Sequence, residues 1–487
     1  MHTRGKPDVL LLAAAILFSS APQNPVAESF PMSTTVAVAA AQAPETTPLV
    51  APTEGAQAPA DGLVDCGADR GRAGRGSVHV DACLAELGAA RPAQLARFAS
   101  GFDVDRGDDL NLATDLGESG SADTTSGWWA GLEQAQRTSL IAAVPGVVGN
   151  LEGVPYAERD LANRVSLATT ITTLERQEGV PVDGLVTLAT DTPRLAMLKN
   201  VARSLVPGTA GDDTARSLVS LDTVFPGRAA IAIGDLDTAQ DVSYLVPGML
   251  FTVGTTMQGW TDTAATLHSE QQFWTNTLAT TSSAPKSVAT VAWMGYRTPG
   301  ILNVAGMSLA REGAVHLEDA LTGLRADRAG DEPRLTVIAH SYGSTTSTIA
   351  FSSGKVSADS LVLVGSPGSV VPAAKELAVT PGQVFVGAAP LDPVAGSAFF
   401  GADPGATQFG ATLLNVGSGT DPYTHEHLAM SLSHNDYFLP GTNSLRSMAL
   451  IGIGRSDLAD GTPPAPASPQ PVQPNLGLVR PQDIYRD

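Results

Sequence analysis

Between residues 217 and 416, short apolar runs alternate with longer segments whose apolar residues recur every three or four positions. Such alternation predicts strands and helices in turn, and therefore a mostly parallel sheet with helices on both faces. A hairpin at 217–224 and 229–233, turned by Pro226-Gly227-Arg228, is expected to open the series. The later expected strands are 242–246, 288–293, 334–338, 361–364, 383–386 and 411–416, with helices at 257–278 and 307–324 among them.

The expected strand 334–338 ends in Ala339-His340-Ser341-Tyr342-Gly343, and a run of small residues at 344–350 can continue as a helix. A serine at a sharp strand-to-helix turn needs small residues two positions away on each side, because larger side chains would collide with the backbone of the turn. Ala339 and Gly343 meet this need. The segment is therefore predicted to be a nucleophile elbow.

Two further polar residues follow expected strands in the chain order that an α/β hydrolase requires. Asp392 comes after 383–386, and His434 lies beyond 411–416 in the polar turn 433–436. A serine hydroxyl is a poor nucleophile at neutral pH, so an imidazole must accept its proton and a carboxylate must orient that imidazole. The sequence thus predicts an α/β-hydrolase fold with Ser341 as nucleophile, His434 as base and Asp392 as acid.

The negatively charged oxygen formed during such a reaction needs backbone N–H donors. One is expected from Tyr342, which follows the nucleophile. The other is expected from the loop after 242–246, where Pro247 has no N–H and Gly248 allows close approach of the backbone. Met249 N–H is therefore the second predicted donor of the oxyanion hole.

Other residues compete for these roles. His425 and His427 are alternative bases, and Asp403 and Asp421 are alternative acids. His340 adjoins the serine, but a neighbour on a tight turn points away from it, so a structural role is expected.

The sequence supports a metal site less well than it supports a serine nucleophile. Asp235, Asp237 and Asp241 resemble part of a calcium loop, but the glycine and the final glutamate of an EF-hand are absent. The cluster 425–427 with His434 has no HExxH helix beside it. Neither a metal nor another cofactor is predicted.

The N-terminus carries Arg4 and Lys6, an apolar run at 9–18 and small residues at 19–21, a pattern typical of a signal peptide. The run is shorter than the roughly 20 residues of a membrane span, so no stable span is expected. In an exported chain the only two cysteines, Cys66 and Cys83, are expected to form a disulfide. A secreted or envelope location is predicted.

Composition divides the remainder of the chain. The segments 22–62, rich in Ala, Pro and Thr, and 460–487, rich in Pro, are expected to be disordered after a signal peptide at 1–21. A mainly helical module is predicted at 63–207 and the hydrolase domain at 217–459. Apolar residues at 157, 161, 165, 168 and 171 predict one amphipathic helix of the first module.

The formal net charge of −20 disfavours binding to phosphate backbones and anionic membranes, so nucleic acid is excluded as an expected partner.

Several motifs together resemble a bacterial α/β-hydrolase family of largely uncharacterised enzymes in which a helical N-terminal part precedes the sheet. The stretches that carry the likeness are 128–129 (WW), 149–155 (GNLEGVP), 159–160 (RD), 162–163 (AN), 246–249 (VPGM), 340–344 (HSYGS), 364–368 (VGSPG) and 434–437 (HNDY). The resemblance covers about 128–454 and implies a serine hydrolase fold that serves in the cell envelope, but no substrate. Ala339, where glycine is usual, departs from the family pattern.

The leading expectation is an exported serine esterase or lipase-like enzyme that forms an acyl-enzyme on Ser341 and acts on a small-molecule or lipid ester. A peptidase or thioesterase could use the same residues, and a catalytically silent envelope binding or scaffold protein is the alternative from another class. The helical module is a candidate cap over the site, with Trp128 and Trp129 as its apolar contacts or, alternatively, as core residues.

Overall fold

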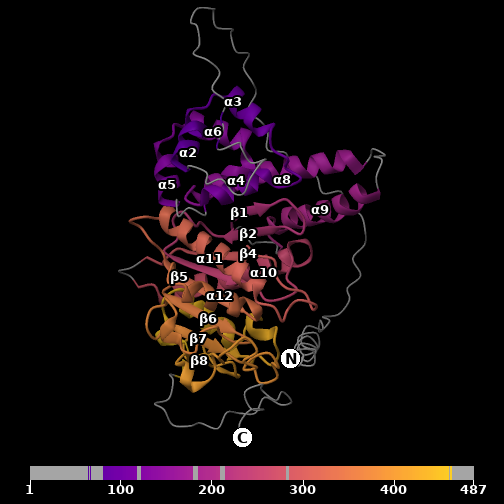
Figure 1. Ribbon diagram of the computed structural model, residues 1–487. Helices are drawn as coiled ribbons and strands as arrows, with labels where there is room; N and C mark the ends of the chain where they lie inside the picture. Colours follow the sequence, from indigo (N-terminus) through magenta and orange to yellow (C-terminus); the bar gives the residue numbers. More distant parts are fainter. Residues whose placement is uncertain are drawn as a thin grey trace, which may run out of the picture. The chain divides into compact units, whose positions relative to one another are not determined.

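A computed structural model describes residues 64, 66, 80–117, 122–178, 185–208, 214–280, 284–459 and 461–462 (Figure 1). The predicted signal peptide at 1–21, the segment 22–62 and nearly all of the tail 460–487 lie outside the described residues. Helices dominate up to residue 208, and strands alternate with helices after it. Within the described ranges, no helix combines the length and apolar character needed to cross a bilayer.

The described residues form a nine-stranded sheet in the order β1-β2-β4-β3-β5-β6-β7-β8-β11. Its first two strands are an antiparallel hairpin, and the strands from β4 to β8 are parallel neighbours. This arrangement confirms the predicted hairpin and the mostly parallel sheet. The strands are β1 Arg216–Asp222, β2 Arg228–Ile233, β3 Asp241–Val246, β4 Val288–Met294, β5 Arg334–His340, β6 Ser360–Val364, β7 Val384–Gly387, β8 Thr412–Leu414 and β11 Gly461–Thr462.

Apolar side chains cover both faces of the sheet. Helices α11 (Ser308–Asp327) and α12 (Tyr342–Ser352) pack on one face, and α10 (Val253–Leu278) and α13 (Asn443–Gly452) pack on the other. Each face of the sheet packs into its own apolar core, and successive strand residues point to opposite faces. Val337 lies in the core with α11 and α12, whereas Ile338 lies in the core with α10 and α13. Both faces are buried, which is why these strands read as nearly continuous apolar runs.

The helical part has a core of its own. It contains the disulfide between Cys66 and Cys83 and the buried ring of Trp129, with Trp128 packed against its edge. The two tryptophans are therefore core residues of the helical part. Its helices are α2 Val80–Ala89, α3 Pro92–Ala99, α4 Asp108–Gly117, α5 Ala122–Gly131, α6 Gln134–Ala143, α7 Pro145–Val148, α8 Tyr156–Glu178 and α9 Leu185–Ser204.

Helix α8 forms where the sequence predicted a helix, but the predicted buried face is wrong. Leu161 is 55% exposed and Val165 is exposed as well, whereas Ala162 and Leu167 are buried. The buried face of α8 also carries Asn163, which makes hydrogen bonds in place of apolar contacts. Apolar spacing alone therefore indicated the wrong side of this helix.

That polar face of α8 and the loop before it cover the outer edge of β1. The Asn150 amide pairs with Leu221 as a strand would, accepting from its N–H at 2.8 Å and donating to its C=O at 2.9 Å. Asp160 accepts the Leu218 N–H at 2.6 Å, and Asn163 donates to the Leu218 C=O at 3.0 Å. The edge groups of β1 are thus satisfied by side chains, which prevents pairing with another strand.

The aspartates compared above with a calcium loop have structural partners instead. Asp237 accepts the N–H groups of Tyr156 and Ala157 at 2.7 and 2.9 Å, which caps the start of α8. Asp235 accepts from Thr238 within its own turn, and Asp241 pairs with Lys286.

We expect Asn150→Ala to lower the free energy of unfolding by about 2 kcal/mol, because the N–H and C=O of Leu221 would lose their partner at a partly buried edge. Urea denaturation measures the effect. Asn111→Ala, at an exposed position of α4, is the matched control and should change stability by less than about 0.5 kcal/mol. Equal midpoints for the two variants would contradict a role of Asn150 in holding the edge.

Candidate active site

Ser341 lies in the turn between β5 and α12, and its backbone has φ 55° and ψ −128°. Few residues other than glycine adopt a positive φ, and such strain is characteristic of a nucleophile at a strand-to-helix turn. The Ser341 N–H donates to the C=O of Val364 at 2.9 Å, which ties the turn to the end of β6. The side chain is buried, with 2% of the residue exposed.

The turn and the loop after β3 approach each other so closely that each needs a glycine at the contact. A Cβ on Gly343 would lie 2.5 Å from the Pro247 carbonyl oxygen, and a Cβ on Gly248 would lie 2.6 Å from Cβ of Ser341. Ala339 is fully buried between β3 and β6, where it pairs with Val246 and Leu363. The turn therefore forms with alanine at the position where glycine is usual.

Asp392 and His434 contact each other directly. Nδ1 of His434 lies 2.9 Å from both carboxylate oxygens of Asp392, and both side chains are buried. Burial raises the pKa of Asp392, but the adjacent His434, the Tyr437 hydroxyl at 2.6 Å and the Val394 N–H at 2.9 Å lower it more, so the net pKa is below its usual range. The carboxylate is therefore ionised at neutral pH.

The other nitrogen of His434, Nε2, is buried and has no hydrogen-bond partner among the residues that the structure describes. Because Nδ1 faces a carboxylate, it carries the proton, which leaves Nε2 with a free lone pair. A buried imidazole nitrogen of this kind can accept a proton from a hydroxyl group.

His340 joins His434 to the nucleophile turn. The two rings have centroids 4.6 Å apart, and Nε2 of His340 donates to the backbone C=O of His434 at 2.8 Å. Burial and the neighbouring His434 lower the pKa of His340 to about 3, so its ring is neutral at pH 7. His340 thus ties the loop of His434 to the end of β5, directly before Ser341.

The two N–H groups expected to form an oxyanion hole belong to Tyr342, the first residue of α12, and to Met249 in the loop after β3. Neither donates to a protein acceptor in the described part of the chain. The Tyr296 hydroxyl donates to the Pro247 C=O at 2.6 Å, and Leu250 N–H donates to the Pro299 C=O at 3.0 Å. These bonds fix the loop on both sides of Met249.

The residues considered as alternative acids and bases do not contact the Asp392–His434 pair. His425 and His427 are exposed, Asp421 is paired with Arg446, and Asp403 accepts the N–H of Gly405. No group of three or more His, Cys, Asp and Glu side chains suited to a metal is present among the described residues.

Sequence reasoning missed two residues of this site. The first is Tyr437, whose hydroxyl donates to Asp392. The second is Gly365, which lies beside the imidazole of His434. A Cβ on Gly365 would lie 2.9 Å from Cε1 and Nδ1 of His434, and the glycine has a φ of 63°. The position of Tyr437, three residues after His434 in the same polar turn, could have indicated that it belongs to the site.

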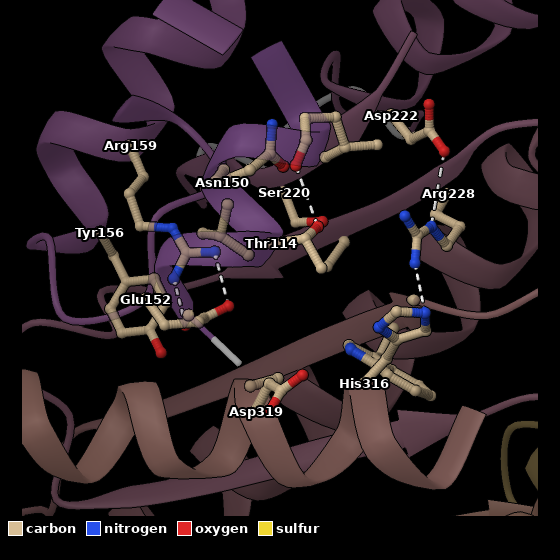
Figure 2. Close-up of a pocket in the computed structure, with 18 of the residues that line it drawn as sticks. Thr114, Asn150, Glu152, Tyr156, Arg159, Ser220, Asp222, Arg228, His316 and Asp319 are labelled. Carbon is tan, nitrogen blue, oxygen red and sulfur yellow. Dashed lines mark hydrogen bonds and ion pairs between the residues drawn. The ribbon is translucent and has the colours of Figure 1, made fainter. Parts of the chain in front are cut away.

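A separate cavity of about 100 Å³, lined by apolar and charged side chains, lies between the helical part and the α11 face of the sheet (Figure 2). Glu152 and Arg159 form a two-bond ion pair at 2.6 and 3.0 Å on one side of it. On the other side Arg228 lies between Asp222 and His316, and burial and the neighbouring arginines lower the pKa of His316 to about 4. These charges are paired with one another, and Ser341 is not among the residues that line the cavity.

Residues 222–402 match the family described as "Alpha/beta hydrolase". An uncharacterised protein of Mycobacterium tuberculosis (strain H37Rv) is 32% identical over 265 residues, which are 50% of this chain and 39% of that protein. An uncharacterised protein of Mycobacterium bovis is 33% identical over 195 residues, which are 38% of this chain and 69% of the relative. The chain thus spans less than half the length of the first of these relatives.

Among solved structures, the carboxyl esterase 2 of the fungus Tuber melanosporum matches with 12% identity and a TM-score of 0.30, covering 54% of this chain and 98% of that one. A lidless serine hydrolase of Xanthomonas campestris matches with 16% identity and a TM-score of 0.30, covering 53% and 100%. These scores are too low to transfer an activity or a substrate.

Gly365→Ala is expected to slow the reaction of Ser341 with a fluorophosphonate by about 100-fold or more, because the added methyl would displace the imidazole of His434 by a fraction of an ångström to an ångström. Labelling rates followed on gels measure this. Gly382→Ala is the matched control: Gly382 has a φ of 79° but nothing within 4 Å of an added Cβ. Similar labelling rates for both variants would contradict the argument from close packing.

Proposed function

Because the chain belongs to a bacterial α/β-hydrolase family with a helical N-terminal part, we propose that it is a serine esterase. In this proposal Ser341 Oγ attacks the carbonyl carbon of a carboxylic ester and forms an acyl-enzyme. The observation that carries the proposal is the buried His434, with Nδ1 on the Asp392 carboxylate and Nε2 free, next to the strained turn of Ser341.

His434 takes the hydroxyl proton of Ser341 during attack and passes it to the departing alcohol. The tetrahedral oxyanion accepts hydrogen bonds from the N–H groups of Met249 and Tyr342. A water molecule then attacks the acyl-enzyme, again losing its proton to His434, and the carboxylic acid leaves as Ser341 regains its hydrogen. Asp392 stays ionised throughout and stabilises the imidazolium.

Two neighbours support the acid in this scheme. The Tyr437 hydroxyl donates to Asp392 and accepts the N–H of Ala389 at 2.8 Å, so it is held in place from both sides. Burial and the negative charge of Asp392 raise the pKa of Tyr437 well above its usual value, which keeps the hydroxyl protonated. Tyr437 is a positioning residue for the carboxylate.

We expect wild-type protein to react with a fluorophosphonate and to hydrolyse a short p-nitrophenyl ester, and Ser341→Ala to lose labelling and at least about 10⁴-fold in kcat. Ser347→Ala, at a buried serine of the same helix α12, is the control and should keep both activities. A folded wild type that remains unlabelled would refute the enzyme proposal and favour a catalytically silent binding protein. Peptide and thioester substrates tested in parallel would reveal whether the same residues serve a peptidase or a thioesterase instead.

We also propose that the protein is exported to the envelope or the exterior. The basic and apolar pattern at 1–21 supports this, as does the Cys66–Cys83 disulfide, since disulfides persist in oxidising compartments. Expression in a bacterial host and fractionation should place the chain outside the cytoplasm, with its N-terminus beyond residue 21. Replacing apolar residues 9–18 by polar ones should retain it in the cytoplasm. Equal distribution of both forms would contradict export by this segment.

A further inference from the structure

The segments around the candidate site leave the sheet at one edge. Strands β3, β4, β6 and β7 run parallel to β5, so the segments 248–252, 298–306, 365–373 and 388–402 all emerge at the end of the sheet where Ser341 lies. The segment 428–433, which leads into His434, reaches the same end.

Hydrogen bonds join these segments to one another and to the nucleophile turn. The Tyr342 hydroxyl donates to the Gly306 C=O at 2.6 Å, and Ser369 and Ala402 exchange two backbone hydrogen bonds of 2.8 Å. Leu391 N–H donates to the Leu432 C=O at 2.9 Å. Hydrogen bonds therefore tie 298–306 to the nucleophile turn, and join 365–373 and 428–433 to 388–402, at the end of the sheet that carries Ser341.

Large aliphatic side chains stand exposed on these segments. Leu302 is 99% exposed at the tip of a turn in which Gly300 N–H donates to Oδ1 of Asn303, and Leu391, next to the catalytic acid, is 59% exposed. We call the exposed set the apolar collar: Leu250, Ile301, Leu302, Val370, Leu391, Met430 and Leu432.

Charge is nearly absent from the same segments. Across 248–252, 298–306, 365–373, 388–402 and 428–433 the sequence contains one ionisable side chain, Asp392, and the structure buries it. Charged residues of the same loops, Arg297, Lys375, Glu376 and Asp403, lie just outside these bounds. Several exposed aliphatic side chains on loops at one end of a sheet point to a place where an apolar partner binds.

The composition of the collar favours lipid over protein as its partner. Protein interfaces obtain most of their binding energy from Trp, Tyr and Arg, with Leu and Val under-represented. The five segments contain none of those three residue types and present Leu, Ile, Val and Met instead. The net charge of −20 disfavours anionic surfaces, so an uncharged or zwitterionic lipid surface fits best.

We propose that the apolar collar docks on an uncharged lipid surface and that the substrate is an ester with aliphatic acyl chains taken from that surface. The substrate part of this statement rests on the proposed esterase function. Ile301 and Leu302 enter the apolar layer at the turn tip, and the remaining collar residues exclude water around the path to Ser341.

The test compares the full-length protein with the double variant Ile301→Gln/Leu302→Gln. Three readouts are flotation with phosphatidylcholine vesicles, hydrolysis of an emulsified short-chain triacylglycerol, and hydrolysis of dissolved p-nitrophenyl acetate. We expect wild type to bind vesicles and the variant to bind at least about tenfold more weakly, since each aliphatic side chain loses its burial. Emulsion hydrolysis should fall in proportion, while the rate on dissolved p-nitrophenyl acetate stays unchanged.

Leu161→Gln/Val165→Gln is the matched control, because these residues are exposed on α8 in the helical part. All proteins keep the same apolar run at 9–18, so any lipid contact by that run cancels in the comparison. The proposal is overturned if wild type does not bind vesicles, if the collar variant binds as well as wild type, or if the control loses as much binding as the collar variant.

The vesicle readout separates the two proposals. Vesicle binding that depends on Ile301 and Leu302, without hydrolysis of either ester or labelling of Ser341, would refute the esterase and the substrate assignment while supporting the docking surface. Hydrolysis of the dissolved ester with no collar-dependent binding would support the esterase and refute the docking surface.

Discussion

The parallel pairing of β5 between β3 and β6 is the constraint on which the site depends. Ala339 lies opposite Val246 on one side and Leu363 on the other, so the turn at Ser341 opens between the ends of two neighbouring strands. The loop after β3 brings Met249 to one side of the turn, and Gly365 after β6 leaves room for His434 on the other. The positive φ of Ser341 is tolerated because strands and helices on all sides hold the turn in place.

The helical part has a clear structural task in this arrangement. The mixed sheet would end in an open strand at β1, and Asn150, Asp160 and Asn163 occupy the hydrogen-bonding groups of that edge. Asn150, Asp160 and Asn163 of the motif stretches thus protect this edge, and Glu152 and Arg159 form an ion pair beside it. Its packing against the sheet also forms one wall of the cavity in Figure 2.

Burial and exposure are divided sharply at the edge of the sheet that carries Ser341. Ser341 and His434, which are proposed to exchange a proton, are buried, and beside them Asp392 has a lowered pKa and His340 is kept neutral by burial. The segments around them contain Asp392 as their one ionisable side chain and present aliphatic side chains to solvent. A buried, preorganised centre beside exposed aliphatic side chains is the basis for the proposed substrate, an ester that carries an apolar chain.

The sequence by itself determined the alternation of strands and helices between 217 and 416, because strands buried on both faces must be apolar throughout and helices between them carry a stripe at helical spacing; it did not indicate α13. It also indicated the turn at Ser341, since only small residues fit around it.

Tertiary structure decided which side of each helix is buried and which loop residues meet at the site. Periodicity could not show that α8 buries Asn163 and Leu167 and exposes Leu161, because the polar groups of β1 lie far away in the sequence. Nor could it show that His434, and not His425 or His427, lies against Asp392, or that Tyr437 donates to that carboxylate, since loops distant in sequence meet only when parallel strands end at one edge.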